Sequence, residues 1–333
     1  MKRFPRWKSE QADRRRKRFG RVIYLLFLLV VTGFLIILFA FFFLTPFLSK
    51  FQSFDRFNVV IAGKDFTVIS ISTLEKTATV IEIPASTLVS FPAFSTRYRI
   101  GALPQLDNAE RKDGRLILNG TTMFLGLPVD RWFIIEDKKV SFKSAEDIKR
   151  FFSYRNLKQN SQSILLHTRL GNLSFFENIQ LSQFIESLRP DKIEFFSLSE
   201  SSILRDVIFA DGSVAKEVDP DALDYFLKGS FIEKHFLSEQ LMIEVRNATN
   251  VSGQAVIVQR LLTNMGGDVI NVTKTDDLNE KTMICVKSSD LLKSYTVLRI
   301  ANIFLSKASL CLEEENRADL TITLGRDYFF RSN

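Results

Sequence analysis

Few residues of this chain could carry chemistry, and they lie near the ends of predicted strands. Lys64-Asp65 and the pair Arg97 and Arg99 occupy such positions. Charged side chains at strand ends can line a binding or reaction site, but they are more commonly solvated loop charges. The residues alone therefore favour solvated loop charges, and a binding or reaction site stays the alternative.

The usual catalytic signatures are missing from the sequence. The two histidines, His167 and His235, are far apart and have no nearby ligand-type partners. A zinc site needs a cluster of three or four such ligands. No nucleophile elbow, P-loop or dinucleotide fingerprint occurs. We therefore predict no metal site, no resident cofactor and no established catalytic residue.

Strands that alternate with helices after residue 56 predict an α/β fold. Three runs rich in β-branched residues are separated by short turns, which is typical of neighbouring strands. A helix is expected to end at Gly126, and a capping box at Ser144-Ala-Glu-Asp147 opens another. The expected strands lie at 57–62, 66–72, 77–83 and 131–136, and the expected helices lie at 113–125, 144–152 and 181–188.

The last 90 or so residues have the clearest pattern. Strand and helix periods follow one another in the order β-α-β-β-α-β, which is typical of a small split βαβ sandwich. Cys285 and Cys311, the two cysteines of the chain, both lie there. Two cysteines do not make a disulfide framework, so two buried thiols are favoured over a bridge, which stays open.

One segment near the start predicts a membrane anchor. Residues 22–44 contain no charged side chain, and a helix of this length would span roughly 30 Å of hydrocarbon. Residues 1–21 hold ten basic and two acidic side chains, a net charge of +8, whereas the whole chain is +7. Because positive flanks stay cytoplasmic, we expect a single-pass plasma-membrane protein with an extracytoplasmic bulk.

The basic tail is interpreted as a topology signal that also contacts anionic lipids, in preference to a nucleic-acid site. The remaining residues sum to −1, so no nucleic-acid partner is expected. The predicted organisation is a tail (1–21), an anchor (22–44), a layered domain (57–200), a connecting region (201–240) and a C-terminal domain (241–330). Within the connecting region, Asp211-Gly212 predicts a turn and Asp219-Pro220 predicts the start of a short helix.

Two stretches resemble a known family. Ile243-Glu-Val-Arg-Asn-Ala-Thr249, Asn264-Met-Gly-Gly-Asp-Val269 and Ala318-Asp-Leu-Thr-Ile-Thr-Leu-Gly-Arg-Asp-Tyr328 resemble the C-terminal domain of LytR-type envelope proteins. Upstream, Asn58-Val-Val-Ile-Ala-Gly63 and Gly126-Leu-Pro-Val-Asp130 resemble a divergent LytR-CpsA-Psr domain. The resemblance implies an α/β/α layered domain followed by a small βαββαβ domain.

The family resemblance also implies a chemistry, namely transfer of glycans from a polyprenyl pyrophosphate carrier to the cell wall with arginines, aspartates and Mg²⁺. Paired guanidinium groups suit phosphate oxygens. Where the family has Ile-Pro-Arg-Asp-Thr, this chain has Ile83-Pro-Ala-Ser-Thr87. The family's Arg-Ser-Asp segment and its later Arg-x-x-Arg-Gln run have no counterpart here. The missing charges favour loss of catalysis with retention of the fold.

Three hypotheses follow. The favoured one is a non-catalytic envelope protein that binds a wall polymer, a lipid-linked precursor or an envelope protein. The second is an active phosphotransferase with a rebuilt site and Mg²⁺, for which the candidate ligand-binding residues are Lys64, Asp65, Arg97, Arg99 and Asp107. The third is an anchor without a ligand.

Overall fold

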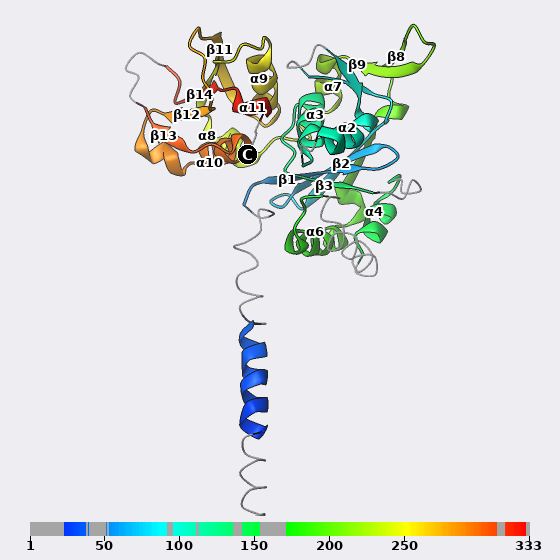
Figure 1. Ribbon diagram of the computed structural model, residues 1–333, viewed down its shortest axis with the longest axis vertical. Coiled ribbons are helices and arrows are strands. Elements are labelled where there is room, and N and C mark those ends of the chain that lie inside the picture. Colours follow the sequence, from blue (N-terminus) through cyan, green and yellow to red (C-terminus); the bar gives the residue numbers. More distant parts are fainter. Residues whose placement is uncertain are drawn as a thin grey trace, which may run out of the picture. The chain divides into compact units, whose positions relative to one another are not determined.

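The computed structural model divides the chain into two compact units, Met1–Lys50 and Phe51–Asn333. It describes residues 23–37, 39, 51, 53–91, 96–110, 113–135, 142–153, 171–311 and 317–330. Figure 1 shows these residues in colour.

The first unit contains the predicted anchor. Residues 23–37 and 39 are helical, and nearly all of their side chains are exposed. Among the residues that the structure describes, no helix reaches the length and apolar character needed to cross a bilayer. Residues 1–21 and the remaining anchor positions lie outside the described ranges, so the membrane span stays a prediction.

The second unit begins with a five-stranded sheet, here called the N-terminal sheet. Its order is β6-β1-β2-β3-β7, antiparallel at its centre and parallel at both edges. Nearly every residue of the three central strands is buried, including polar residues such as Asn58, Ser70 and Thr79. The strands are β1 (Arg56–Ala62), β2 (Phe66–Ser72), β3 (Thr77–Ile83), β6 (Arg131–Ile134) and β7 (Ile193–Ser197).

Helices cover both faces of this sheet, which confirms the predicted α/β fold. Alternate residues of a strand point to opposite faces. Val60 therefore packs into one apolar cluster with Ile117 of a helix on one face, whereas Val59 packs into another with Ile148 and Leu181. Figure 1 shows α2 and α3 on one side of the sheet and α4 and α6 on the other. These helices are α2 (Leu103–Glu110), α3 (Arg115–Leu125), α4 (Ala145–Phe151) and α6 (Phe175–Ser187).

Local sequence signals set several helix ends. Gly126 ends α3 in the left-handed conformation, with φ 64°. Both hydrogen bonds of the predicted capping box at Ser144 are present, and a second box opens α6 at Ser174. The expected helix 113–125 begins two residues later than predicted. The short helix α2 was not predicted, because its eight residues have only a weak apolar period.

Residues 201–240 hold regular structure. A hairpin turns at Asp211-Gly212 as predicted, and Asp219 caps a helix that begins with Pro220. The elements are β8 (Leu204–Ile208), β9 (Val214–Val218), α7 (Pro220–Phe226) and α8 (Lys234–Glu239). A further short pair, β4 (Leu88–Ser90) and β5 (Arg97–Arg99), follows β3. Short 3-10 helices lie at Ile100–Ala102, Pro190–Lys192, Leu198–Glu200 and Ser289–Lys293.

The C-terminal sheet has the order β11-β10-β14-β12-β13. The predicted order of elements is present, with one additional short strand, β13. The pairing differs from a split βαβ sandwich, because α9 returns the chain to β11 directly beside and parallel to β10. The elements are β10 (Met242–Asn247), α9 (Gln254–Asn264), β11 (Asp268–Lys274), β12 (Met283–Val286), α10 (Tyr295–Phe304), β13 (Ala308–Leu310), β14 (Leu320–Leu324) and α11 (Asp327–Phe330).

Cys285 and Cys311 form a disulfide, with their Cα atoms 5.3 Å apart. The prediction of two buried thiols is therefore wrong. The cysteines are 26 residues apart in the sequence, but α10 brings β13 beside β12, and Cys285 pairs with Ser309 in the parallel register. That strand pairing could not be read from the spacing of the cysteines.

A buried arginine joins the two sheets of this unit. Arg299 of α10 is fully buried, and its guanidinium donates to Asp130 Oδ1 at 2.8 Å and to Glu233 Oε1 at 3.0 Å. Asp130 lies just before β6 and also accepts from the Asn58 N–H at 2.9 Å. Burial opposes ionisation, but the two carboxylates outweigh it and raise the pKa of Arg299 above its usual range.

We expect the change Arg299→Met to lower the free energy of unfolding by about 3 kcal/mol, because it leaves two buried carboxylates without their cation. Urea unfolding of the full chain measures this. Arg189→Met is the matched control, since the Arg189 side chain is 78% exposed in its ion pair with Asp191. Equal effects of the two changes would contradict a structural role for the buried network.

We expect removal of the disulfide by Cys285→Ser with Cys311→Ser to lower the free energy of unfolding by about 3 kcal/mol, from the loop entropy of the unfolded chain. Thermal unfolding with and without reductant measures it. The double variant is its own control, because reductant should no longer shift its Tm. If reductant leaves the Tm of the unchanged chain where it was, the bridge contributes no stability.

Candidate functional site

The turn between β1 and β2 carries the first two predicted site residues. Lys64 is exposed. Asp65 is partly buried, and its Oδ1 accepts a hydrogen bond from the Ala85 N–H at 3.0 Å. This contact holds the turn against the Ile83–Thr87 segment, where the resemblance puts the family's charged residues. The Asp65 carboxylate is thus engaged with the main chain.

Arg97 and Arg99 both lie on β5 and contact the β8–β9 hairpin. Arg97 forms an ion pair with Glu217, and Arg99 Nη2 donates to the carbonyl oxygen of Val214 at 3.4 Å. Both arginines are exposed. Both guanidinium groups therefore contact residues of β9, and these contacts do not arrange them around a shared anion.

Asp107 has a structural role in this arrangement. It is 5% exposed, and its carboxylate accepts from the Gly114 N–H at 2.5 Å and from the Leu116 N–H at 2.8 Å. These are two of the N–H groups that a helix leaves unpaired at its start. Asp107 of α2 thus caps the start of α3, where the helix dipole favours a negative charge.

The Ile83–Thr87 segment is covered by neighbouring main chain. The Lys216 N–H donates to Ser86 O at 3.0 Å, and the Ile100 N–H donates to Thr87 O at 2.7 Å. Thr87 is fully buried. Of the five candidates, Asp65 contacts this segment through Ala85, whereas the two arginines contact β9. Across the described residues, no group of three or more His, Cys, Asp or Glu could hold a metal ion.

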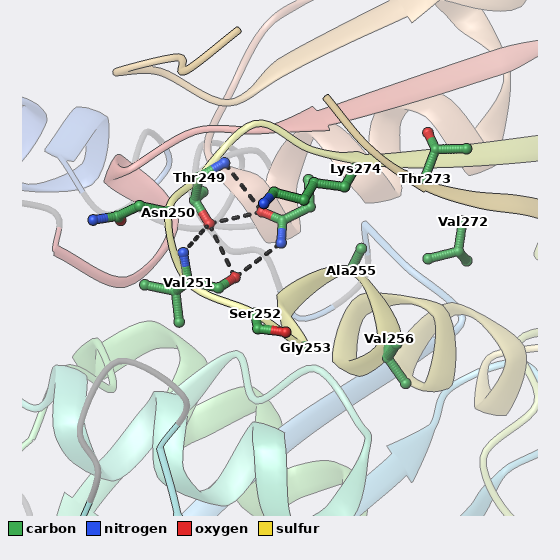
Figure 2. A pocket seen from close by; sticks show the side chains of 11 residues that line it. Thr249, Asn250, Val251, Ser252, Gly253, Ala255, Val256, Val272, Thr273 and Lys274 are labelled. Carbon is green, nitrogen blue, oxygen red and sulfur yellow. Dashed lines mark hydrogen bonds between the residues drawn. The ribbon is translucent and has the colours of Figure 1, made fainter. Parts of the chain in front are cut away.

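Two adjoining cavities lie around the loop between β10 and α9. Their volumes are about 250 Å³ and about 340 Å³. Both are lined by Thr249, Asn250 and Val251. The first also reaches Lys274 at the end of β11, and the second reaches Gln254 and Arg326. Figure 2 shows the first cavity, with the Lys274 side chain extending toward the loop.

Side-chain hydrogen bonds hold this loop in shape. Asn247 Nδ2 donates to Val251 O at 2.9 Å, and Asn247 Oδ1 accepts from the Thr249 N–H at 3.1 Å. The Thr249 hydroxyl donates to Asn247 Oδ1 at 2.7 Å and accepts from the Val251 N–H at 3.2 Å. Asn247 and Thr249 are nearly fully buried, so the loop is ordered without a ligand (Figure 2).

The loop leads into helix α9, whose N-terminus has no side-chain cap. Gly253 stands at the N-cap of α9 with φ 83°, a conformation that other residues rarely adopt, and it makes no side-chain cap bond. Lys274 and Arg326 are the charged residues that line the two cavities, and neither lining includes a carboxylate. The electrostatics of the cavities therefore favour an anion.

Sequence reasoning did not find these cavities as a site. The run Asn247-Ala-Thr-Asn-Val-Ser-Gly253 was recognised only as part of the family pattern. A polar run without carboxylates directly before an apolar helix was the available signal. Lys274 and Arg326 lie 20 or more residues away in sequence, and only the parallel pairing of β10 with β11 and β14 brings them near.

Comparison with protein families finds one match. Residues 240–328 match the family described as LytR cell envelope-related transcriptional attenuator. The predicted LytR-type C-terminal domain is therefore confirmed. A search of curated proteins finds no match.

Three solved structures, compared by identity, coverage and TM-score, resemble part of this chain. Bacillus subtilis TagV has 15% identity and a TM-score of 0.37, covering 51% of this chain and 94% of its own. The LytR-CPS2A-psr family protein TagT with bound octaprenyl pyrophosphate has 18% identity and a TM-score of 0.35, covering 51% and 87%. A transcriptional regulator from Enterococcus faecalis has 11% identity and a TM-score of 0.38, covering 64% and 89%.

We expect Asp107→Asn to lower the free energy of unfolding by about 2 kcal/mol, because the α3 N–H groups lose charged acceptors. Urea unfolding measures it. Glu110→Gln is the control, since Glu110 is exposed on the same helix. An unchanged stability for Asp107→Asn, together with loss of a ligand-dependent activity, would return Asp107 to the list of functional candidates.

Proposed function

From the LytR-type domain at residues 240–328, we propose that this chain is a membrane-anchored protein of cell-envelope assembly that binds an envelope component without catalysing its transfer. The component is a wall polymer or a lipid-linked precursor. The N-terminal sheet supplies the divergent LytR-CpsA-Psr domain of this proposal.

The anchor and the charge distribution support the membrane location. The uncharged run 22–44 is long enough to span a bilayer, and the net charge of +8 in residues 1–21 favours a cytoplasmic N-terminus. Membrane lipids are then partners of the anchor and of the basic tail.

The Cys285–Cys311 disulfide supports an extracytoplasmic position for the second unit. Disulfides persist in oxidising compartments and are rare where thiols are kept reduced. An external location would also bring the domain within reach of lipid-linked precursors.

One observation carries the non-catalytic part of the proposal. Three of the five charged candidates already have protein partners: Asp65 accepts from Ala85, Asp107 caps α3, and Arg97 pairs with Glu217. Transfer from a pyrophosphate needs cations that converge on the phosphates and balance their developing charge. Arg97 and Arg99 would have to leave Glu217 and the Val214 carbonyl oxygen before they could serve in that way.

The alternative is a transferase with a rebuilt site that uses Mg²⁺. The position of Asp65 favours it, because this carboxylate lies beside the segment that holds the family's arginine and aspartate. In that case Lys64 and the two β5 arginines would turn toward the same ligand.

The test uses the full chain in detergent with a polyprenyl-pyrophosphate-linked glycan and Mg²⁺. We expect saturable binding without release of polyprenyl pyrophosphate or transfer of glycan to peptidoglycan. The matched variants are Arg97→Gln with Arg99→Gln, and Arg189→Gln as an exposed control. Turnover that is lost only in the β5 variant would establish the transferase, and the absence of both binding and turnover would leave an anchor without this ligand.

A further inference from the structure

We propose that the outer side of helix α10 docks on the lipid–water interface of the membrane that holds the anchor. The proposal rests on the membrane anchor of the proposed function, and it adds a second lipid contact, made by the folded part of the chain. The docking surface, here called the α10 surface, consists of Leu298, Leu305, Leu310, Lys293 and Lys307.

The α10 surface carries three exposed leucines. Leu298, Leu305 and Leu310 are 51%, 67% and 46% exposed. At 3.6 residues per turn, Leu298 and Leu305 lie on one stripe of the helix, and Ile300, which packs into the core of the C-terminal domain, points the other way. Leu310 pairs with the core residue Val286, so it lies on the face of the sheet that α10 covers.

Leu305 occupies a position that usually belongs to glycine. It ends α10 in the left-handed conformation, with φ 45°. Glycine adopts this conformation without a steric cost, whereas a residue with a Cβ strains the backbone. Because Leu305 is also the most exposed of the three leucines, it contributes more to the outer surface than to the core, at a cost to the backbone.

The start of α10 is attached to the segment that follows the anchor. The Asp55 N–H donates to the Tyr295 hydroxyl at 2.7 Å, and the rings of Phe54 and Tyr295 pack edge to face with their centroids 6.0 Å apart. The Asp55 carboxylate also accepts from the His235 N–H at 2.7 Å, so α8 fixes the same segment. These contacts hold α10 close to residues 54 and 55.

Chain connectivity limits the distance between this segment and the bilayer. The uncharged run ends at residue 44, and Phe51 is 2% exposed within the second unit. The six residues 45–50 span at most about 20 Å when fully extended. A bilayer spanned by residues 22–44 is therefore within reach of the α10 surface, which favours lipid as its occupant over a second copy of the chain.

The charges at the two ends of α10 suit lipid phosphates. Lys293 precedes the helix, Lys307 follows it, and both are exposed. Lysines beside an apolar surface can bury their alkyl chains and keep the ammonium group among the headgroups. Asp290 is the single carboxylate in the sequence from Lys287 to Cys311, so lysines predominate around the leucines.

The test places a fluorescent reporter on the α10 surface of the full chain in phosphatidylcholine nanodiscs. Trp7→Phe leaves the buried Trp132 as a constant background. Leu298→Trp adds the reporter, and Ile270→Trp is the matched control, because Ile270 is 42% exposed on β11 at the opposite edge of the same sheet. We expect a blue shift for Leu298→Trp and quenching by lipids brominated near the headgroups, and neither effect for Ile270→Trp.

A further variant separates docking from folding. Added to Leu298→Trp, the change Leu305→Gly should lower the docking equilibrium constant about tenfold, as expected when one interfacial leucine is lost. Its Tm should not fall, because glycine relieves the left-handed strain at this position. Leu278→Gly is the control, since Leu278 is 51% exposed outside the α10 surface, and it should leave the quenching unchanged.

The outcomes distinguish this proposal from the membrane anchor. If the chain stays in the nanodisc but Leu298→Trp is not quenched, or if both reporters are quenched equally, the α10 surface does not dock and the anchor stands. A blue shift without quenching that grows with the number of chains per nanodisc would mean contact between copies, and it would also overturn the proposal. Loss of the chain from the nanodisc would contradict the anchor itself.

Discussion

The arrangement of the second unit depends on the buried guanidinium of Arg299. A fully buried cation is tolerated only with close carboxylates, and here Asp130 and Glu233 come from two separate stretches of the chain. Arg299 Nη2 also donates to Arg56 O at 3.4 Å, and its Cζ lies 4.6 Å from the centre of the Phe54 ring. The Arg299 guanidinium therefore joins the start of β1, the residue before β6 and helix α10.

Arg260 makes a second set of contacts that also holds the C-terminal part of this unit against its N-terminal part. Arg260 of α9 donates to Asp224 and to the carbonyl oxygens of Met123 and Phe124 at the end of α3. Those carbonyls are the negative end of a helix, which a guanidinium complements. Gly126 follows directly, and a Cβ at this glycine would lie 2.7 Å from Asn264 Nδ2. Gly126 thus ends α3 and also leaves room for α9.

The sequence predicted the features that depend on neighbours in the chain. The apolar runs of β1, β2 and β3, the capping box at Ser144 and the turn at Asp211-Gly212 follow from period, caps and turn residues. The disulfide, the order of the C-terminal sheet and the short helix α2 were missed. Each of these is decided by contacts between distant segments, and a periodic pattern contains no information on which strands become neighbours.

The candidate site shows the same difference between features that sequence neighbours determine and features that distant contacts determine. Asp65 and Arg97 were chosen because they are charged residues near predicted strand ends, and Asp65 in fact accepts from the Ala85 N–H. A residue type and a place in the sequence do not tell whether the carboxylate of Asp107 caps a helix or faces a ligand. Asp107 is fully used by the start of α3, and Arg97 by Glu217. Only the three-dimensional partners separate these roles.

Helix α9 extends from its contacts with α3 to the cavity at its N-terminus. Its side chains Arg260 and Asn264 contact α3, Gly126 and Asp224, whereas its first turn opens into the cavity. Asn247 and Thr249 hold the preceding loop from the other side. Both ends of α9 are therefore fixed by contacts within the second unit, so this helix holds the C-terminal sheet against the end of α3.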